Sequence, residues 1–225
     1  MRKITDSLYA TELRSFSRFK PFHSNAFYLK RPCGNHFVLY NTGHLEFEEH
    51  WLRAEGGVSR QYLSHSHEAG STCNWLKENF SNLTYIHRSD ALNAQRECEI
   101  DGTFNQDERI GTDFHIIHTP GHTPGSTCFY WVAPNNLKVM FVGDILVPDK
   151  RGEFMLFMDD HSKKNEACME RTLVMLYDYD VDLIIPRGSE GDIEWLWSPH
   201  EEWTDIIDKA IVRLRTKLLH FSKRI

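Results

Sequence analysis

The stretch Thr119-Pro120-Gly121-His122-Thr123-Pro124-Gly125-Ser126 decides the fold of this chain. Its two prolines and two glycines predict a tight, restrained loop around one histidine. Strand-like runs over residues 114–118 and 126–133 flank the loop, so His122 is expected at the end of a strand. A loop with a purely structural role does not need a rigidly held imidazole, which makes His122 a candidate metal ligand.

Two further segments place polar side chains at the ends of predicted strands. Leu63-Ser64-His65-Ser66-His67 continues a strand-like run that begins at residue 60. In an extended strand, residues i and i+2 point to the same face, so His65 and His67 can reach one ion. Phe141-Val142-Gly143-Asp144 is an apolar run that ends in a carboxylate, for which a turn or helix-cap role is the alternative. The three histidines and Asp144 form a ligand set suited to zinc or a similar divalent metal.

The rest of the chain predicts a mixture of strands and helices. We expect strands at residues 25–30, 37–40, 60–64, 83–86, 114–118, 126–133, 138–142 and 183–185, and helices at 45–54, 71–80 and 164–177. A last helix follows residue 198, where Trp203, Ile207 and Leu214 recur at helical spacing and predict core packing. Strands come first in each half and a helix closes each half, which suggests two sheets covered by helices.

Composition narrows the classes of function. The chain has 225 residues without an internal repeat or linker, so we read residues 1–225 as one domain. Its formal net charge is −6 and it has no basic tract, so we expect a small-molecule substrate rather than nucleic acid or a membrane. We find no apolar run long enough to span a membrane and no secretory signal. Five cysteines without a C-x-x-C motif favour reduced, mostly buried thiols and a cytoplasmic location, and the oligomeric state is not readable.

Taken together, the motifs resemble those of the metallo-β-lactamase superfamily, which includes glyoxalase II. The resemblance runs from the strand that ends in Tyr40-Asn41-Thr42-Gly43 to the strand Ile184-Ile185-Pro186. It implies an α/β fold, an αβ/βα four-layer sandwich of two mixed β-sheets flanked by helices. The resemblance also implies a metal site at one edge, between the two sheets.

The departures from the family pattern are concentrated on one side of that site. Where the family has H-x-H-x-D-H, this chain has Ala69 and Gly70 in place of the aspartate and the last histidine. The late P-G-H-G motif reads Pro186-Arg187-Gly188-Ser189, so its histidine is also missing, and Asn41 replaces the usual aspartate of D-T-G. The resemblance therefore implies one intact metal site, formed by His65, His67, His122 and Asp144, and one lost site.

Two charged residues lie near the lost site in the sequence. Glu68 is one position away from the lost aspartate, and strand alternation predicts that its side chain points elsewhere. Arg187 either places a positive charge where the second cation would sit or is an ordinary exposed arginine.

The intact site is compatible with three functions. The first is a hydrolase of a small ester, thioester or lactone that uses one divalent metal, zinc in preference to iron, with Asp144 acting as both ligand and base. The second is a noncatalytic binding or sensing module that keeps the fold. The third uses His65, His122 and Asp144 as a 2-His-1-carboxylate iron triad, as in the persulfide dioxygenases of the same superfamily.

The remaining histidines and the late tryptophans are read as structural. This group comprises His87, His115, His118, His161, His200, Trp195 and Trp197. Each histidine is expected to be a surface or packing residue rather than a ligand. Trp195 and Trp197 are expected in core or interface packing rather than in a pocket wall.

Overall fold

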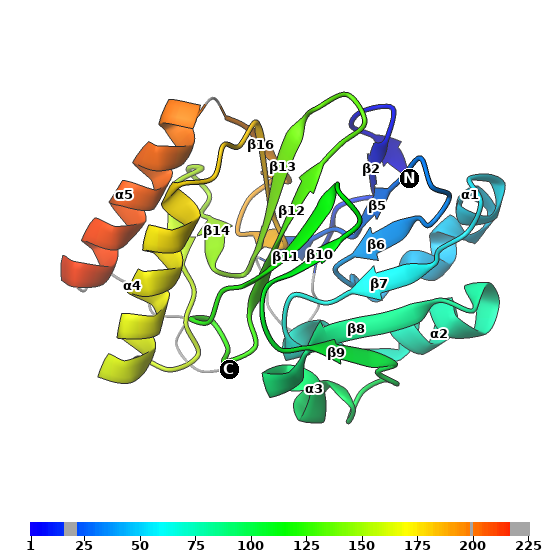
Figure 1. Cartoon of the computed structure of the whole chain (residues 1–225), viewed down its shortest axis with the longest axis horizontal. Helices are drawn as coiled ribbons and strands as arrows, with labels where there is room; N and C mark the ends of the chain where they lie inside the picture. The colour runs from blue at the N-terminus through cyan, green and yellow to red at the C-terminus, as the bar shows by residue number, and fades with distance from the viewer. Residues whose placement is uncertain (16–21, 199, 217–225) are drawn as a thin grey trace.

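The computed structural model describes residues 1–15, 22–198 and 200–216. Two large β-sheets pack against each other, with α1, α2 and α3 on the outer side of one sheet and α4 and α5 on the outer side of the other (Figure 1). This is the expected four-layer arrangement of two mixed sheets flanked by helices.

The first half of the chain forms a seven-stranded sheet with the strand order β1-β2-β5-β6-β7-β8-β9. Its strands are β1 (Arg2–Lys3), β2 (Leu8–Ala10), β5 (Phe27–Leu29), β6 (Phe37–Leu39), β7 (Arg60–Tyr62), β8 (Leu83–His87) and β9 (Gly102–Phe104). Its helices are α1 (Glu49–Ala54), α2 (Ser71–Phe80) and α3 (Arg88–Ala94), with short 3-10 turns η1 (Leu45–Glu48) and η2 (Ser66–Glu68). The strands from β6 to β9 run parallel, so the segments that follow them leave from one edge of the sheet.

The second half forms a six-stranded sheet with the order β10-β11-β12-β13-β16-β18. These strands are β10 (Glu108–Ile110), β11 (Phe114–His118), β12 (Thr127–Val132), β13 (Lys138–Gly143), β16 (Leu183–Pro186) and β18 (Leu196–Trp197). The helices α4 (Lys163–Tyr177) and α5 (His200–Thr216) cover it. Five short strands form two small sheets. In one, β14 (Leu146–Pro148) pairs with β15 (Phe154–Leu156); in the other, β4 (His23–Ser24) pairs with both β17 (Gly188–Ser189) and β3 (Arg14–Ser15).

Successive side chains of a strand point to opposite faces of its sheet, and each face packs against a different apolar cluster. In β13, Val139 and Phe141 belong to the apolar cluster between the sheets, whereas Met140 and Val142 belong to the cluster beneath α4 and α5. Both faces are buried, which explains why this strand reads as a continuous apolar run in the sequence. Trp203 is fully buried in the helix-side cluster, so the apolar stripe of the last helix packs as predicted.

Most of the predicted elements are found, but the strand predicted to carry the H-x-H motif is shorter than expected. The predicted helix at 71–80 coincides with α2, and the predicted strands at 114–118 and 138–142 coincide with β11 and β13 within one residue. The strand at 60–64, however, ends at Tyr62. Residues 66–68 form the turn η2, so the H-x-H motif does not lie on an extended strand end.

Other observations concern the membrane and the cysteines. Within residues 1–15, 22–198 and 200–216, no helix is both long and apolar enough to cross a membrane.

Cys73, Cys98 and Cys128 are buried, and all five cysteines are free thiols. The expectation of mostly buried, unpaired cysteines is confirmed.

Tyr40 ties the two sheets together directly beside the site. Its buried hydroxyl donates to the Ile185 carbonyl at 3.1 Å and accepts the Gly143 N–H at 2.9 Å. These two partners precede Arg187 and Asp144, so the hydroxyl stabilises the strand ends that carry the site residues.

We expect Tyr40→Phe to lower the free energy of unfolding by about 1–3 kcal/mol, because the Gly143 N–H would be left buried without its acceptor. Urea-induced unfolding measures the change. Tyr177→Phe, at a position 38% exposed on α4, is the matched control and should leave stability unchanged. Equal midpoints for the two variants would show that the hydroxyl does not hold the sheets together.

Candidate metal centre

The three histidines predicted from the sequence converge at one edge of the two sheets. His65 lies just after β7, His67 lies in η2, and His122 lies in the loop between β11 and β12. One nitrogen from each imidazole can be chosen so that all three lie within 4.8 Å of one another. The rings of His65 and His122 are closest, with centroids 4.5 Å apart and an interplanar angle of 86°. This spacing lets three imidazoles face a single ion.

The H-x-H motif reaches this position through a turn rather than a strand. His65 is extended, with φ −165° and ψ 170°, and the chain then turns so that the Glu68 N–H donates to the His65 carbonyl at 3.3 Å. His65 is buried, whereas the side chain of His67 is 51% exposed. The alternation argument therefore does not describe these residues, although both imidazoles still face the centre.

The turn also reverses the prediction for Glu68. Its side chain is buried rather than directed elsewhere, and Oε1 accepts the Ser64 N–H at 3.2 Å. The same oxygen lies 3.3 Å from His65 Nδ1. The prediction that Glu68 points away from the site is wrong because it assumed an extended backbone over residues 66–68.

Asp144 and Arg187 complete the inner part of the site. Asp144 Oδ2 lies 3.3 Å from His65 Nε2, 3.8 Å from His122 Nε2 and 3.4 Å from Arg187 Nη1. The last contact follows from sheet topology, since β13 pairs with β16 in parallel and Gly143 is aligned with Pro186. Asp144 and Arg187 each follow one of these aligned residues.

Arg187 is buried, so the alternative of an ordinary exposed arginine is wrong. Its Nε lies 3.9 Å from Glu68 Oε1, which places the guanidinium between two carboxylates. Gly188 adds no side chain here, and a Cβ at this position would lie 2.8 Å from the His23 carbonyl oxygen. A permanent positive charge thus stands beside the carboxylate that the resemblance assigns to both metals.

Charges and burial set the protonation of the site. Burial alone would raise the pKa of the Asp144 carboxyl, but Arg187 and His65 outweigh it and hold the pKa well below its usual range. Burial opposes protonation of His65, yet the Asp144 and Glu68 carboxylates raise its pKa to about 9. Burial and the neighbouring His65 lower the pKa values of His67 and His122, so these two imidazoles are neutral near pH 7. Metal ligands must be neutral imidazoles, so His65 has to release its proton when an ion binds.

Several buried polar atoms at the centre lack hydrogen bonds. Within the part of the chain that the structure describes, His65 Nε2, both ring nitrogens of His122 and Asp144 Oδ1 form none. Buried polar atoms without partners are unfavourable unless a water molecule or an ion satisfies them. Imidazole nitrogens with one carboxylate are the donors that zinc and iron accept, so these residues fit a divalent cation.

Comparison with known proteins gives the fold. No protein-family model matches the chain, and no curated protein matches its sequence. Solved structures do match. A metallo-β-lactamase from Cronobacter sakazakii, a HARLDQ motif mutant, superimposes with a TM-score of 0.68 over 96% of both chains at 13% identity. This chain has the metallo-β-lactamase fold.

Two other structures with the metallo-β-lactamase fold agree. The Staphylococcus aureus metallo-β-lactamase gives a TM-score of 0.65 at 18% identity, covering 92% of this chain and 67% of the other. The metallo-β-lactamase GOB-18 from Elizabethkingia meningoseptica gives 0.62 at 12% identity, covering 87% and 86%. At these identities the likeness concerns the fold, and the chemistry must be argued from the residues of this chain.

The metallo-β-lactamase fold here holds its histidine loops together through Asp90, which the sequence analysis missed. This buried residue in the first turn of α3 accepts the Ser66 N–H at 2.9 Å, the Thr123 hydroxyl at 2.7 Å and the Gly125 N–H at 2.9 Å. A Cβ on Gly125 would lie 2.6 Å from Asp90 Cγ, which explains the glycine. One carboxylate thus joins the H-x-H turn to the His122 loop.

A second carboxylate missed by the sequence analysis lies on the open side of the centre. Asp159 Oδ2 is 3.3 Å from His67 Nε2, and Oδ1 is 3.6 Å from His122 Nδ1. Its side chain is 43% exposed, like that of the neighbouring His67, whereas His65, His122 and Asp144 are buried. Solvent therefore reaches the edge of the centre at His67 and Asp159.

Three of the other histidines singled out from the sequence contact residues outside this centre. His87 and His118 stack on each other with ring centroids 3.9 Å apart, and His115 contacts the Tyr179 hydroxyl at 3.3 Å. Asn41, which replaces the usual aspartate, holds the turn after His65, because its Nδ2 donates to the Glu68 carbonyl at 2.9 Å. His161 is exposed, and the side chain of His200 lies outside the described part of the chain.

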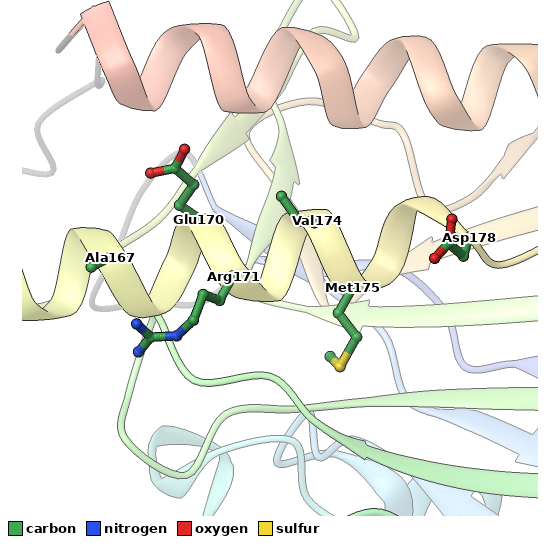
Figure 2. Close-up of a pocket in the computed structure, with 6 residues that line it drawn as sticks. All are labelled: Ala167, Glu170, Arg171, Val174, Met175 and Asp178. Atoms are coloured by element: carbon green, nitrogen blue, oxygen red, sulfur yellow. The ribbon is translucent and has the colours of Figure 1, made fainter.

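The late tryptophans and the hollow on α4 do not involve the four predicted site residues. Trp195 packs against the inter-sheet cluster as expected, and Trp197 is 51% exposed. Figure 2 shows a hollow on the surface of α4. Its lining residues are Ala167, Glu170, Arg171, Val174, Met175 and Asp178. None of the four predicted site residues contributes to it. The histidine centre is therefore the better candidate for the functional site.

Proposed function

We propose that this protein is a metal-dependent hydrolase that holds one divalent cation with His65, His67, His122 and Asp144. Zinc is the first choice of metal and iron is the alternative. The observation that carries the proposal is the convergence of three imidazoles within 4.8 Å, beside a buried carboxylate 3.3 Å from His65 Nε2.

Arg187 supports a mononuclear centre. A second divalent cation beside Asp144 would meet a guanidinium that stays charged at all accessible pH values. Ala69, Gly70 and Gly188 offer no side-chain donors where the family supplies ligands. Repulsion and the missing ligands therefore act together against a second ion.

The residues of the centre suggest how hydrolysis proceeds. When bound, a divalent cation supplies a Lewis acid that polarises a carbonyl group and favours ionisation of a water molecule. Asp144 Oδ2 faces two imidazoles and Arg187, whereas Oδ1 is buried and forms no hydrogen bond within the described residues. We assign Oδ1 as the atom that accepts the proton of the attacking water.

The same contacts limit the rate. Arg187 and His65 hold the pKa of Asp144 low, which keeps it ionised but makes it a weak base. We therefore propose slow turnover of an activated small ester, thioester or lactone. Phosphodiesters are poorer candidates, because their cleavage commonly uses two ions and the −6 charge of the chain does not attract nucleic acid.

We expect one metal ion per chain and no second ion. Purified protein should be loaded with excess zinc, dialysed against a weak chelator and analysed for metal and protein content. The expected result is close to one zinc per chain, because Arg187 occupies the position beside Asp144. A value near two would mean that another residue replaces the missing ligands, and the single-site argument would be wrong.

Metal content after purification separates the alternative functions. Zinc supports the hydrolase. Iron supports the 2-His-1-carboxylate alternative. One observation favours it: of the three imidazoles, those of His65 and His122 are the two that lie within 4.0 Å of the Asp144 carboxylate. A protein that takes up neither metal and hydrolyses no ester would be the noncatalytic module.

A further inference from the structure

Asp159 lies behind two of the three imidazoles rather than between them. Its Oδ2 is 3.3 Å from His67 Nε2 and its Oδ1 is 3.6 Å from His122 Nδ1. The backbone adds a third link, because the Asp159 N–H donates to the His122 carbonyl at 3.2 Å. The residue follows β15 and belongs to no motif recognised in the sequence.

The two nitrogens of each ring distinguish the inner side of the centre from the outer side. His65 Nε2 and His122 Nε2 both face Asp144 Oδ2, at 3.3 and 3.8 Å, so these nitrogens are directed inward. On the outer side, His65 Nδ1 faces Glu68 at 3.3 Å, and His122 Nδ1 faces Asp159. In His67 it is Nε2 that faces Asp159, which leaves Nδ1 for the ion.

We propose that Asp159 is a positioning residue that holds His67 and His122 for the metal by accepting their outer N–H groups. The inference rests on the proposed function, since it concerns the same ion. A carboxylate behind a ligating histidine selects the tautomer, orients the ring and makes the inner nitrogen a better donor. Both present distances exceed the usual 2.7–3.2 Å by about half an ångström or less, so a small side-chain movement completes the bonds.

The location explains why such a residue is needed here. His65 is buried and is held by Ser64 and Glu68, with Ser64 Oγ 2.9 Å from its Nδ1. His67 is 51% exposed, so packing alone leaves its ring freer to rotate. One carboxylate that contacts both His67 and the His122 ring restrains the open side of the centre.

The adjacent Asp160 provides a matched control. Its carboxylate accepts the Ser162 N–H at 2.9 Å and the Ser162 hydroxyl at 2.7 Å, at the start of α4. Both residues are exposed aspartates after the same strand, and among the interactions described only Asp159 contacts His67 and His122. Replacing either residue with asparagine removes one negative charge at almost the same place.

The test compares zinc affinity in the wild type, Asp159→Asn and Asp160→Asn by competition with a chromophoric chelator. We expect a loss of about 10–100-fold for Asp159→Asn, as for other outer-sphere partners of metal histidines, and no loss for Asp160→Asn. Cobalt(II) absorption gives a second readout, because a displaced imidazole changes the intensity of the visible bands. Thermal unfolding of the metal-free proteins should give equal midpoints.

Each other outcome overturns a stated claim. Equal zinc affinity for Asp159→Asn and the wild type would refute the positioning role while leaving the metal site intact. A parallel loss in Asp160→Asn would show a general charge effect and would also refute it. A lowered midpoint in metal-free Asp159→Asn would assign the residue to the fold. If the wild type bound neither zinc nor cobalt, the proposed function itself would be wrong.

Discussion

His122→Ala is expected to abolish metal binding and, with it, metal-dependent hydrolysis. The imidazole is fully buried, and the ring centroids of His65 and His67 lie 4.5 and 5.2 Å away. Loss of an outer-sphere partner commonly reduces metal affinity by about 10–100-fold, so removal of a direct ligand should reduce it by more than about 100-fold. The remaining imidazoles cannot compensate, because the Pro- and Gly-rich loop would present only a methyl group to the ion.

The measurement uses nitrophenyl esters, thioesters and lactones, with zinc and iron added separately. His50→Ala, at an exposed histidine of α1, is the matched control and should keep the wild-type rate. Zinc content is measured on the same samples, so that a lost rate can be compared with a lost ion. Equal rates for His122→Ala and the wild type would show that the centre does not catalyse these reactions.

Asp90→Ala is expected to lower the free energy of unfolding by about 3–5 kcal/mol. The substitution leaves two buried backbone N–H groups, of Ser66 and Gly125, without an acceptor, and each such group is unfavourable by about 1–3 kcal/mol. The Thr123 hydroxyl loses less, because Ser126 Oγ lies 2.9 Å away as another partner. A small cavity beside Gly125 adds to the loss.

Urea-induced unfolding measures this effect, with Asp208→Ala on the exposed side of α5 as the control. The more conservative Asp90→Asn keeps the volume but turns one acceptor into a donor, so we expect an intermediate loss. Zinc affinity should fall as well, because Asp90 joins the H-x-H turn to the His122 loop. Stability within about 0.5 kcal/mol of the wild type would show that Asp90 does not hold these loops.

Local patterns in the sequence determined most of the fold and the inner residues of the centre. The loop around His122 was predicted correctly, because proline and glycine determine the backbone conformation over a few residues independently of their surroundings. The strand that ends before Asp144 was also predicted correctly, because a strand buried on both faces needs apolar side chains throughout. Such signals need no knowledge of distant segments. That His65, His67 and His122 meet was implied by the family resemblance, and the structure brings the three imidazoles together.

Only the tertiary structure decided what surrounds these residues. Glu68 faces inward because η2 replaces an extended backbone, and the length of β7 depends on its neighbours β6 and β8. Asp90 and Asp159 lie 33 and 37 positions from Thr123 and His122, and an isolated aspartate in a helix or loop carries no distinguishing pattern. From the sequence alone, Arg187 could be either buried beside the site or exposed. A guanidinium is stable in the interior only beside carboxylates, and the parallel pairing of β13 with β16 brings Asp144 to it.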